Sequence, residues 1–312
     1  MSALLDVILP VFLVIGFGYA AARARLFPDG AVDGLMRFAQ TFAVPCLLFR
    51  GVARLDLSAA YDPALMISFY TGAYVSFGLC LAGALWLFRR PLTDAIAIGF
   101  VGLFSNSLLL GLPITERAYG PDALAGNYAI ISVHSPLLYA TGIALMEWAK
   151  SRGIGLSGGQ LARQIAKAIL SQPLVIGIAA GFAVNLSGLD LPVAVWSAID
   201  LMARAAIPAA LFGLGGVLVR YRPEGDRATI AMICAGSLVV HPGITYALGQ
   251  WVFALPTPGL RSAVVTAAMA PGINAYMFAH YYGVAKRVSA SAVLIATALS
   301  MGSVWVWLQI LP

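Results

Sequence analysis

One amide and two helix breakers stand close together in an apolar stretch of the sequence, "LFSNSLLLGLPITERAYG" (residues 103–120). Asn106 is followed five residues later by Gly111 and seven residues later by Pro113. Proline removes a backbone donor from a helix and clashes with the preceding turn. An amide can donate a hydrogen bond to a carboxylate without carrying a buried charge of its own. The stretch therefore predicts a broken helix whose free backbone groups and amide bind an anion.

A second stretch, "VVTAAMAPGINAYMFAHYYG" (residues 264–283), repeats this combination with Pro271, Gly272 and Asn274, and with Tyr276 as a further polar side chain. A half-helix that begins at such a break points free N–H groups and a partial positive charge inward, which suits an anion. Neither stretch has Asp or Glu at mid-depth, so an anionic or neutral ligand is favoured over a cation. The structural alternative is a pair of kinks satisfied by the hydroxyls of Ser105 or Ser107.

The composition predicts an integral membrane protein, because 61% of the 312 residues are apolar and only 10% are charged. Soluble domains carry roughly 25% charged residues. We attribute the net charge of +6 to Lys and Arg on the cytoplasmic side and expect no nucleic-acid partner. No run resembles a phosphate loop, a catalytic triad or a metal cluster. We therefore expect no enzyme activity, no catalytic residues, no cofactor and no metal site.

Ten stretches are long and apolar enough to span a bilayer core, which needs about 20 residues per helix. Fourteen of the 19 Lys and Arg residues lie in or beside the loops after odd-numbered spans, which places those loops in the cytoplasm and both termini outside. The first stretch has no positive charge before its apolar run, so it is interpreted as a span and not as a signal peptide. The spans are 4–22, 35–53, 64–88, 95–118, 127–149, 166–187, 196–219, 228–254, 262–282 and 288–311.

The sequence also carries an internal repeat. A shift of 163 residues places Pro10 on Pro173 and "AVPCLLF" (43–49) on "AIPAALF" (206–212). We therefore predict a five-helix repeat at 1–149, a cytoplasmic linker at 150–165 and a second five-helix repeat at 166–312. Because five is odd, the second repeat enters the membrane inverted, as in many secondary transporters. The alternative is a duplicated membrane scaffold without transport activity.

Three segments resemble the auxin efflux carrier family: "FAVPCLLF" (42–49), "NSLLLGLPI" (106–114) and "APGINAYMFAHYYGV" (270–284). The resemblance implies a scaffold domain and a transport domain, broken helices four and nine that cross at the site, and an elevator-like movement. It implies transport of organic anions, auxin in plants and dicarboxylates such as malonate in some bacteria. Asn106 matches the family's helix-four Asn, which contacts the substrate carboxylate. Plant carriers have a second Asn beside the helix-six proline, where this sequence has Gln172.

The sequence thus predicts a secondary transporter of small organic anions, such as auxin-like monocarboxylates or malonate, in the inner membrane. Its partners are that anion and the lipid bilayer, and a homodimer is one arrangement that the prediction allows. A proton- or sodium-coupled symporter or antiporter on the same fold is the alternative, and His134 and His241 serve either coupling or packing. Arg204 either pairs with Asp200, one turn earlier, or faces the substrate. His280 stands where it could line an exit.

Overall fold

The computed structural model describes residues 3–150 and 157–312, and within this part of the chain the regular structure is helical, with one isolated β-bridge. The predicted all-α membrane protein is thus confirmed at that level. Among the described residues, seven helices are long and apolar enough to cross a membrane, or eight if one bent pair counts as a single span. Residues 151–156 of the predicted linker lie outside the described residues.

The chain divides into two compact units, each of which takes segments from both halves of the sequence. The smaller unit comprises Pro10–Ala60 and Ala166–Arg220, and the larger unit comprises the described parts of Met1–Leu9, Tyr61–Ile165 and Tyr221–Pro312. Each unit is therefore stabilised by contacts between segments that are far apart in sequence.

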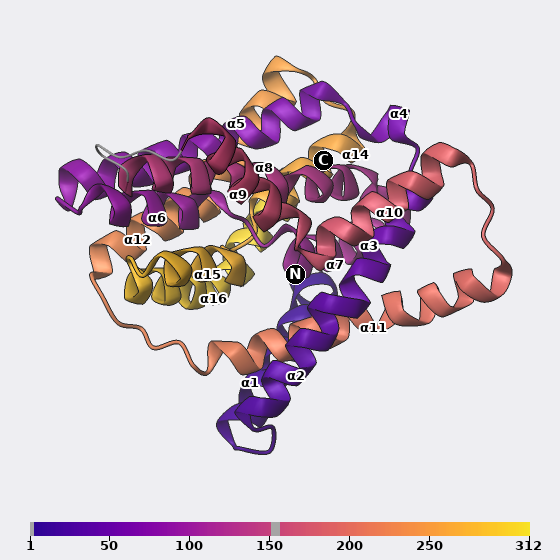
Figure 1. Cartoon of the computed structure of the whole chain (residues 1–312), viewed down its shortest axis with the longest axis horizontal. Helices are drawn as coiled ribbons and strands as arrows, with labels where there is room; N and C mark the ends of the chain where they lie inside the picture. The colour runs from indigo at the N-terminus through magenta and orange to yellow at the C-terminus, as the bar shows by residue number, and fades with distance from the viewer. Residues whose placement is uncertain (1–2, 151–156) are drawn as a thin grey trace. The chain divides into compact units, whose positions relative to one another are not determined.

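Helix α3 forms the centre of the smaller unit, where it packs along α10 and α11 (Figure 1). Glycines allow these close approaches, since a Cβ on Gly177 would lie 2.5 Å from the carbonyl oxygen of Pro45. Small residues at helix contacts are typical of membrane proteins, in which backbone proximity replaces the hydrophobic effect. The elements of this unit are α1 (Leu9–Arg23), α2 (Asp29–Phe38), η2 (Ala39–Ala43), α3 (Val44–Ala53), α4 (Leu57–Ala60), α10 (Pro173–Ser187) and α11 (Val193–Leu218).

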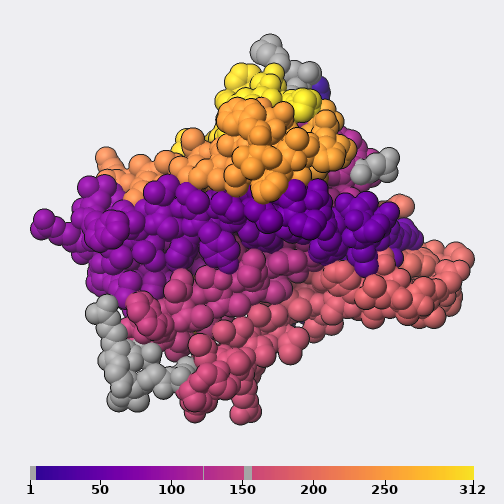
Figure 2. All heavy atoms as spheres, turned by 90° about the horizontal axis from the view of Figure 1, so that it is seen from above, coloured from indigo at the N-terminus to yellow at the C-terminus, as the bar shows by residue number. Residues whose placement is uncertain are grey.

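Helix α5 forms the centre of the larger unit and packs against α6, α13 and α14. Figure 2 shows the orange and yellow atoms of the C-terminal helices packed on the purple atoms of the α5 region. The elements of this unit are η1 (Ala3–Ile8), α5 (Pro63–Ala82), η3 (Gly83–Leu87), α6 (Leu92–Leu103), η4 (Ser107–Gly111), α7 (Leu112–Tyr119), η5 (Pro121–Leu124), α8 (Ala125–Lys150), α12 (Arg227–Ala235), η6 (Gly236–Val240), α13 (His241–Ala247), η7 (Leu248–Val252), α14 (Thr257–Ala267), α15 (Ile273–Tyr282) and α16 (Lys286–Ile310).

Local sequence explains where α5 begins. The side chain of Asp62 caps the helix by accepting a hydrogen bond of 2.8 Å from the backbone N–H of Ala64. Pro63 occupies the first turn, where its missing donor costs nothing. The cap and the proline fix the start of the helix on which the other elements of the unit are packed.

The sixth expected span, 166–187, is wrong as a single helix. Helix α9 (Gly158–Leu170) and α10 are separate and meet at an angle of 80°. The cause is Pro173, since the residue before a proline is driven out of the helical region, and Gln172 has an extended ψ of 123°. The apolar span therefore begins at Pro173 and not at residue 166.

Candidate functional site

The fourth and ninth expected spans are each interrupted, and the two interruptions pair with each other inside the larger unit. Helix α6 ends at Leu103 and η4 begins at Ser107, whereas α14 ends at Ala267 and α15 begins at Ile273. Between these ends, Ser105 and Pro271 form an isolated antiparallel β-bridge. The interrupted segments of the two spans therefore lie side by side.

Two backbone hydrogen bonds join the interrupted segments 104–106 and 268–272, and we call this pair of segments the crossing. The N–H of Asn106 donates to the carbonyl of Ala270 over 2.8 Å, and the N–H of Gly272 donates to the carbonyl of Phe104 over 3.0 Å. A backbone polar group without a partner costs several kcal/mol in a membrane. Each break therefore supplies partners that the other break needs, which makes two interruptions stable where one alone would be costly.

The interruption in the fourth span lies earlier than the helix breakers suggest. It falls at 104–106, whereas Gly111 and Pro113 lie in a continuous stretch formed by η4 and α7. The backbone in η4 has π-helical hydrogen bonds, and Gly111 donates to Asn106, five residues back. Such a π-turn changes the bonding register, so the missing donor of Pro113 is tolerated without a break. In the ninth span the interruption does include Pro271 and Gly272, as predicted.

Two half-helices start at the crossing. Asn106 is the N-cap residue of the first, and its Oδ1 accepts a hydrogen bond of 3.3 Å from the N–H of Leu109. Gly272 is the N-cap residue of the second, α15, and no side chain caps it. Helix N-termini carry a partial positive charge of about half an elementary charge each and expose N–H groups. The crossing therefore gathers two positive helix ends at one place.

The Asn106 side chain lies at the start of one half-helix and beside the start of the other. Its residue is only 8% exposed, and its Nδ2 makes no hydrogen bond within the described parts of the chain. Gly272 is adjacent, since a Cβ at this position would lie 3.7 Å from Cγ of Asn106. The amide NH₂ is thus a free donor beside two positive helix ends, which is a suitable arrangement for a carboxylate.

His134 from α8 contacts the crossing. Its Nε2 lies 3.2 Å from the carbonyl oxygen of Ser105, and its ring packs against Phe104 with centroids 4.9 Å apart. The same ring contacts Phe69, which in turn contacts the buried ring of His241 with centroids 4.9 Å apart. The sequence left the role of both histidines open, and the structure places His134 in direct contact with the crossing.

A second polar contact was not anticipated from the sequence. Asn127, at the start of α8, donates from Nδ2 to the hydroxyls of Thr115 (3.0 Å) and Thr266 (2.8 Å), and all three residues are fully buried. Thr115 lies on α7 and Thr266 on α14, so the amide ties together the two arms that flank the crossing. An Asn within an apolar stretch was the available signal for this contact.

The remaining predicted site residues lie away from the pairing itself. Gly111 packs against the end of α14 and the segment after it, where a Cβ would lie 3.6 Å from Cα of Thr266 and 3.4 Å from Cγ of Met269. Pro113 is buried in α7. The carbonyl of Asn274, the second residue of α15, accepts a hydrogen bond of 3.4 Å from the hydroxyl of Tyr139. The structure thus brings together Asn106, Pro271 and Gly272, with Gly111 and Asn274 close by in sequence.

Tyr276 is directed to a different cluster. Its hydroxyl lies 3.3 Å from Nδ1 of His280, and its ring lies 4.8 Å from that of Tyr221. Gln172 belongs to the smaller unit, where it is the N-cap residue of α10 without a side-chain cap bond. Neither residue takes part in the pairing of the two interrupted spans.

The suggested pairing of Arg204 with Asp200 is wrong. Asp200 faces α3 instead, where its Oδ1 lies 3.5 Å from Nη1 of Arg50 and 4.0 Å from Nη1 of Arg54. Spacing along α11 alone allowed the local pair, but α3 presents two guanidinium groups to the same carboxylate. Arg204 is exposed and makes no ion pair among the described residues.

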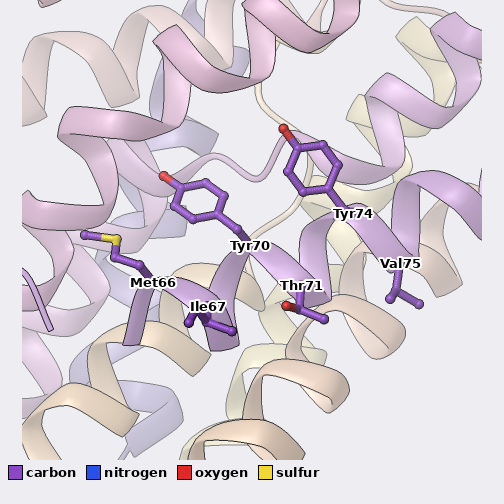
Figure 3. A pocket seen from close by; sticks show the side chains of 6 residues that line it. All are labelled: Met66, Ile67, Tyr70, Thr71, Tyr74 and Val75. Atoms are coloured by element: carbon purple, nitrogen blue, oxygen red, sulfur yellow. The ribbon is translucent and has the colours of Figure 1, made fainter. Parts of the chain in front are cut away.

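A hollow of about 550 Å³ runs along one face of α5 (Figure 3). Six residues of that helix line it: Met66, Ile67, Tyr70, Thr71, Tyr74 and Val75. The tyrosine hydroxyls are already bonded to α8, Tyr70 to the carbonyl of Ile130 (3.0 Å) and Tyr74 to the hydroxyl of Thr141 (2.7 Å). The hollow therefore offers an apolar surface and few free polar groups, unlike the crossing.

Comparison with known proteins agrees with this architecture. A family model described as "Membrane transport protein" matches residues 3–308. The chain belongs to this family, which includes the auxin efflux carriers. The predicted resemblance is thus confirmed, and family membership indicates a multi-pass membrane transporter and not an enzyme.

Three relatives carry different names. The chain is 27% identical to a putative malonate transporter of Rhizobium meliloti, over 97% of this chain and 94% of that protein. It is 21% identical to auxin efflux carrier component 5 of Arabidopsis thaliana, over 95% of this chain and 93% of that protein. It is also 27% identical to the lysosomal cholesterol signaling protein of Mus musculus, where the match covers 78% of this chain and 29% of the larger protein.

Proposed function

We propose that the protein is a secondary transporter of small organic anions. The observation that carries this proposal is the crossing, where two half-helix N-termini and the free amide NH₂ of Asn106 meet beside Gly272. Together the two helix ends offer about one elementary positive charge, which balances one carboxylate. The family relatives named as malonate and auxin carriers support the same class of substrate, which includes monocarboxylates and dicarboxylates.

We further propose that transport follows an elevator-type alternating access. The division into units supports this, because the smaller unit collects the first, second, sixth and seventh expected spans and the larger unit collects the rest. The crossing lies wholly within the larger unit, so this unit is the proposed transport domain and the smaller unit the proposed scaffold. An inner-membrane location is part of the same proposal, and the distribution of Lys and Arg supports an orientation with both termini outside.

The inverted repeat of two five-helix units is part of this proposal, and two contacts in the smaller unit support it. A Cβ on Gly18 would overlap the carbonyl oxygen of Phe212, and a Cβ on Gly181 would lie 2.9 Å from the carbonyl oxygen of Phe49. Gly181 follows Gly18 by 163 residues, and Phe212 follows Phe49 by the same number. The two contacts are therefore equivalent under the shift that aligns the two halves of the sequence.

Uptake of labelled malonate and of an auxin-like monocarboxylate into proteoliposomes tests the function. Asn106→Asp is the informative variant, because Asp keeps the N-cap acceptor but replaces the NH₂ donor by a negative charge. We expect this variant to fold normally and to lose uptake at least tenfold, whereas Asn106→Ala loses both cap and uptake. If Asn106→Asp takes up the anion as fast as the wild type does, the amide does not belong to the binding site.

Coupling to protons or sodium is the second candidate, and it is favoured by the buried histidines of the larger unit. His241 is fully buried, and neither of its ring nitrogens has a hydrogen-bond partner among the described residues. Collapsing the proton or sodium gradient with a selective ionophore in the same uptake assay distinguishes the two mechanisms. Loss of accumulation with one ionophore identifies the coupling ion, and unchanged accumulation excludes coupling.

A further inference from the structure

Helix α9 has one apolar side and one polar side. The apolar residues Leu161, Ile165 and Ile169 recur every four positions and therefore share one side of the helix. The opposite side carries Arg163 and Lys167, and both are exposed. None of the described residues of α9 is buried, so the protein covers the apolar side only in part. Because a helix of 13 residues is marginal in water by itself, this side needs a further apolar neighbour.

The bend before Pro173 sets the direction of α9 in the membrane. Helices α9 and α10 meet at an angle of 80°, and the apolar span continues along α10. Membrane-spanning helices are tilted by about 20° on average from the bilayer normal. A helix at 80° to such a span lies within about 30° of the membrane plane. Helix α9 is therefore directed along the surface of the bilayer and not across it.

A contact with α8, within the larger unit, sets the depth of α9. Nε2 of Gln164 donates to Oε1 of Glu147 over 3.1 Å, and Glu147 lies three residues before α8 ends at Lys150. Trp148, in the same last turn, is 62% exposed. Tryptophan at the end of a span is typical of the membrane–water interface, and lysine there is typical of the cytoplasmic side. The contact thus places α9 at the level of the lipid headgroups.

The segment that contains α9 is positively charged. Between Glu147 and Asp190 the sequence has no acidic residue and four basic ones: Lys150, Arg152, Arg163 and Lys167. The cytoplasmic surface of a membrane carries anionic lipids and attracts such segments. Long basic side chains can lay their stems along apolar surface and keep the charged group among the headgroups. The charge of this segment therefore complements an anionic lipid surface.

We propose that α9 is an interfacial helix that binds anionic phospholipids of the cytoplasmic leaflet. Its apolar side lies among the acyl chains, and Arg163 and Lys167 contact headgroup phosphates. The chain passes from the larger unit to the smaller one within this helix, after Ile165, so the lipid holds that connection at the membrane surface. The inference goes beyond the proposed function and does not depend on which solute is transported.

Lipid titrations test the polar side of α9. Phosphatidylglycerol, phosphatidylcholine and inorganic phosphate are each titrated into the purified full chain in detergent, and the apparent affinity is taken from the thermal shift. The double variant Arg163→Gln with Lys167→Gln should bind phosphatidylglycerol at least tenfold more weakly, because each basic residue near an anionic surface contributes about fivefold. Its binding of phosphatidylcholine should not change, and inorganic phosphate should not shift the melting of any variant.

Two further double variants are the controls. Arg163→Lys with Lys167→Arg keeps both charges and should bind phosphatidylglycerol like the wild type. Lys286→Gln with Arg287→Gln removes two exposed charges at the start of α16, away from the amphipathic helix, and its affinity should stay within twofold of wild type. The comparison separates a site on α9 from attraction by positive charge in general.

Spin labels test the apolar side. The three native cysteines are replaced by alanine, and Ile165→Cys or Gln160→Cys then carries a nitroxide in vesicles that contain phosphatidylglycerol. The label at Ile165 should be accessible to oxygen, which dissolves among acyl chains, and protected from a water-soluble nickel complex. The label at Gln160, on the polar side, should show the reverse.

Several results would overturn the inference. Equal loss of affinity in the α9 and α16 charge-removing variants would show that no site on α9 is involved, and an equal shift by inorganic phosphate would show a simple anion site. A label at Ile165 that the nickel complex reaches would place the apolar side in water, and a label that neither reagent reaches would place it against protein. None of these results bears on the transport of organic anions, which the uptake measurements decide.

Discussion

The backbone N–H of Asn106 donates to the carbonyl of Ala270 over 2.8 Å and so bonds one interrupted span to the other. The side chain of the same residue caps the half-helix that begins with η4. This bond fixes the direction of the Asn106 side chain relative to both half-helices. Its Oδ1 is used for capping, which leaves the NH₂ group for a ligand. The crossing thus determines which end of the amide a substrate meets.

Gly272 lies directly beside that amide residue. A Cβ here would lie at ordinary contact distances, 3.6 Å from Cα of Asn106 and 3.7 Å from its Cγ, and φ is −76°, which any residue adopts. We therefore expect Gly272→Ala to fold with a free energy of unfolding within about 1 kcal/mol of wild type. The added methyl group occupies space next to the NH₂ donor, so KM for the anion should rise several-fold. Uptake kinetics and thermal melting measure the two effects, and an unchanged KM would place the substrate elsewhere.

Substitutions of His134 test whether the crossing needs a hydrogen-bond donor from α8. His134→Leu removes the bond to the Ser105 carbonyl, which still accepts from the N–H of Ser107 over 2.8 Å. Because the Ser105 carbonyl keeps this partner, loss of the bond from His134 should cost about 0.5–1.5 kcal/mol, and the melting temperature should fall accordingly. His134→Gln can donate an amide N–H to the same carbonyl and should recover part of the stability and the uptake. His280→Gln, at an exposed position, is the control and should melt like the wild type.

The same variants distinguish positioning from proton coupling. If His134 only positions Ser105, His134→Gln keeps the pH profile of wild-type uptake. A proton carrier cannot be replaced by an amide, so a flat pH profile in His134→Gln would instead support coupling.

The sequence was sufficient to predict the helical membrane class, the two interrupted spans and the family. It placed the ninth-span break correctly, because Pro271 and Gly272 both disfavour helix locally. It misplaced the fourth-span break, because residues 104–106 contain neither Gly nor Pro and their extended backbone is stabilised by residues more than 160 positions away. The preference of Asn106 for N-cap positions was the local signal for the correct boundary.

Side-chain pairing was less predictable than the breaks. The i, i+4 spacing of Asp200 and Arg204 suggested a local ion pair, yet Arg50 and Arg54 on α3 take the carboxylate. Spacing within one helix cannot reveal charges that another helix presents. The contacts of Asn127 with Thr115 and Thr266 are non-local for the same reason.

Asn127 joins α7 and α14, so its loss should loosen the crossing. Asn127→Leu leaves the buried hydroxyls of Thr115 and Thr266 without this donor, and we expect the free energy of unfolding to fall by about 1–3 kcal/mol. Replacing both threonines by valine in the same chain removes the orphaned hydroxyls and should restore part of the stability. Thermal melting of the single and triple variants checks this, and equal melting of wild type and Asn127→Leu would show that the amide contributes nothing.

Asp226 provides a pH-dependent contribution outside the membrane-spanning segments. Hydrogen bonds from the Thr229 hydroxyl and from backbone N–H groups at the start of α12 lower the pKa of this carboxyl. A lowered pKa in the folded state means that folding favours the charged form. Its stabilisation is therefore fully present above the unfolded pKa of about 3.9 and is lost as pH falls through the folded pKa. The difference in melting temperature between wild type and Asp226→Asn should be constant at neutral pH and shrink below about pH 4.

Gly18 of α1 lies against the backbone of Phe212 of α11 in the smaller unit. A Cβ on Gly18 would overlap the backbone carbonyl of Phe212, which cannot move away as a flexible side chain could. We expect Gly18→Ala to separate α1 from α11 and to destabilise by several kcal/mol, because overpacking alone costs typically 1–3 kcal/mol and here displaces backbone. Gly181→Ala, whose Cβ would lie 2.9 Å from the carbonyl oxygen of Phe49, should destabilise less.

Gly16→Ala is the matched control for this series, since it lies on the same helix and a Cβ there meets nothing within 4 Å. Alanine is favoured over glycine within a helix by about 1 kcal/mol, so this variant should melt at or slightly above the wild-type temperature. Fluorescence-detected size-exclusion after stepwise heating ranks the three variants. If Gly18→Ala and Gly16→Ala melt alike, α1 and α11 do not approach as closely as the Gly18–Phe212 contact requires, and this support for the inverted repeat is lost.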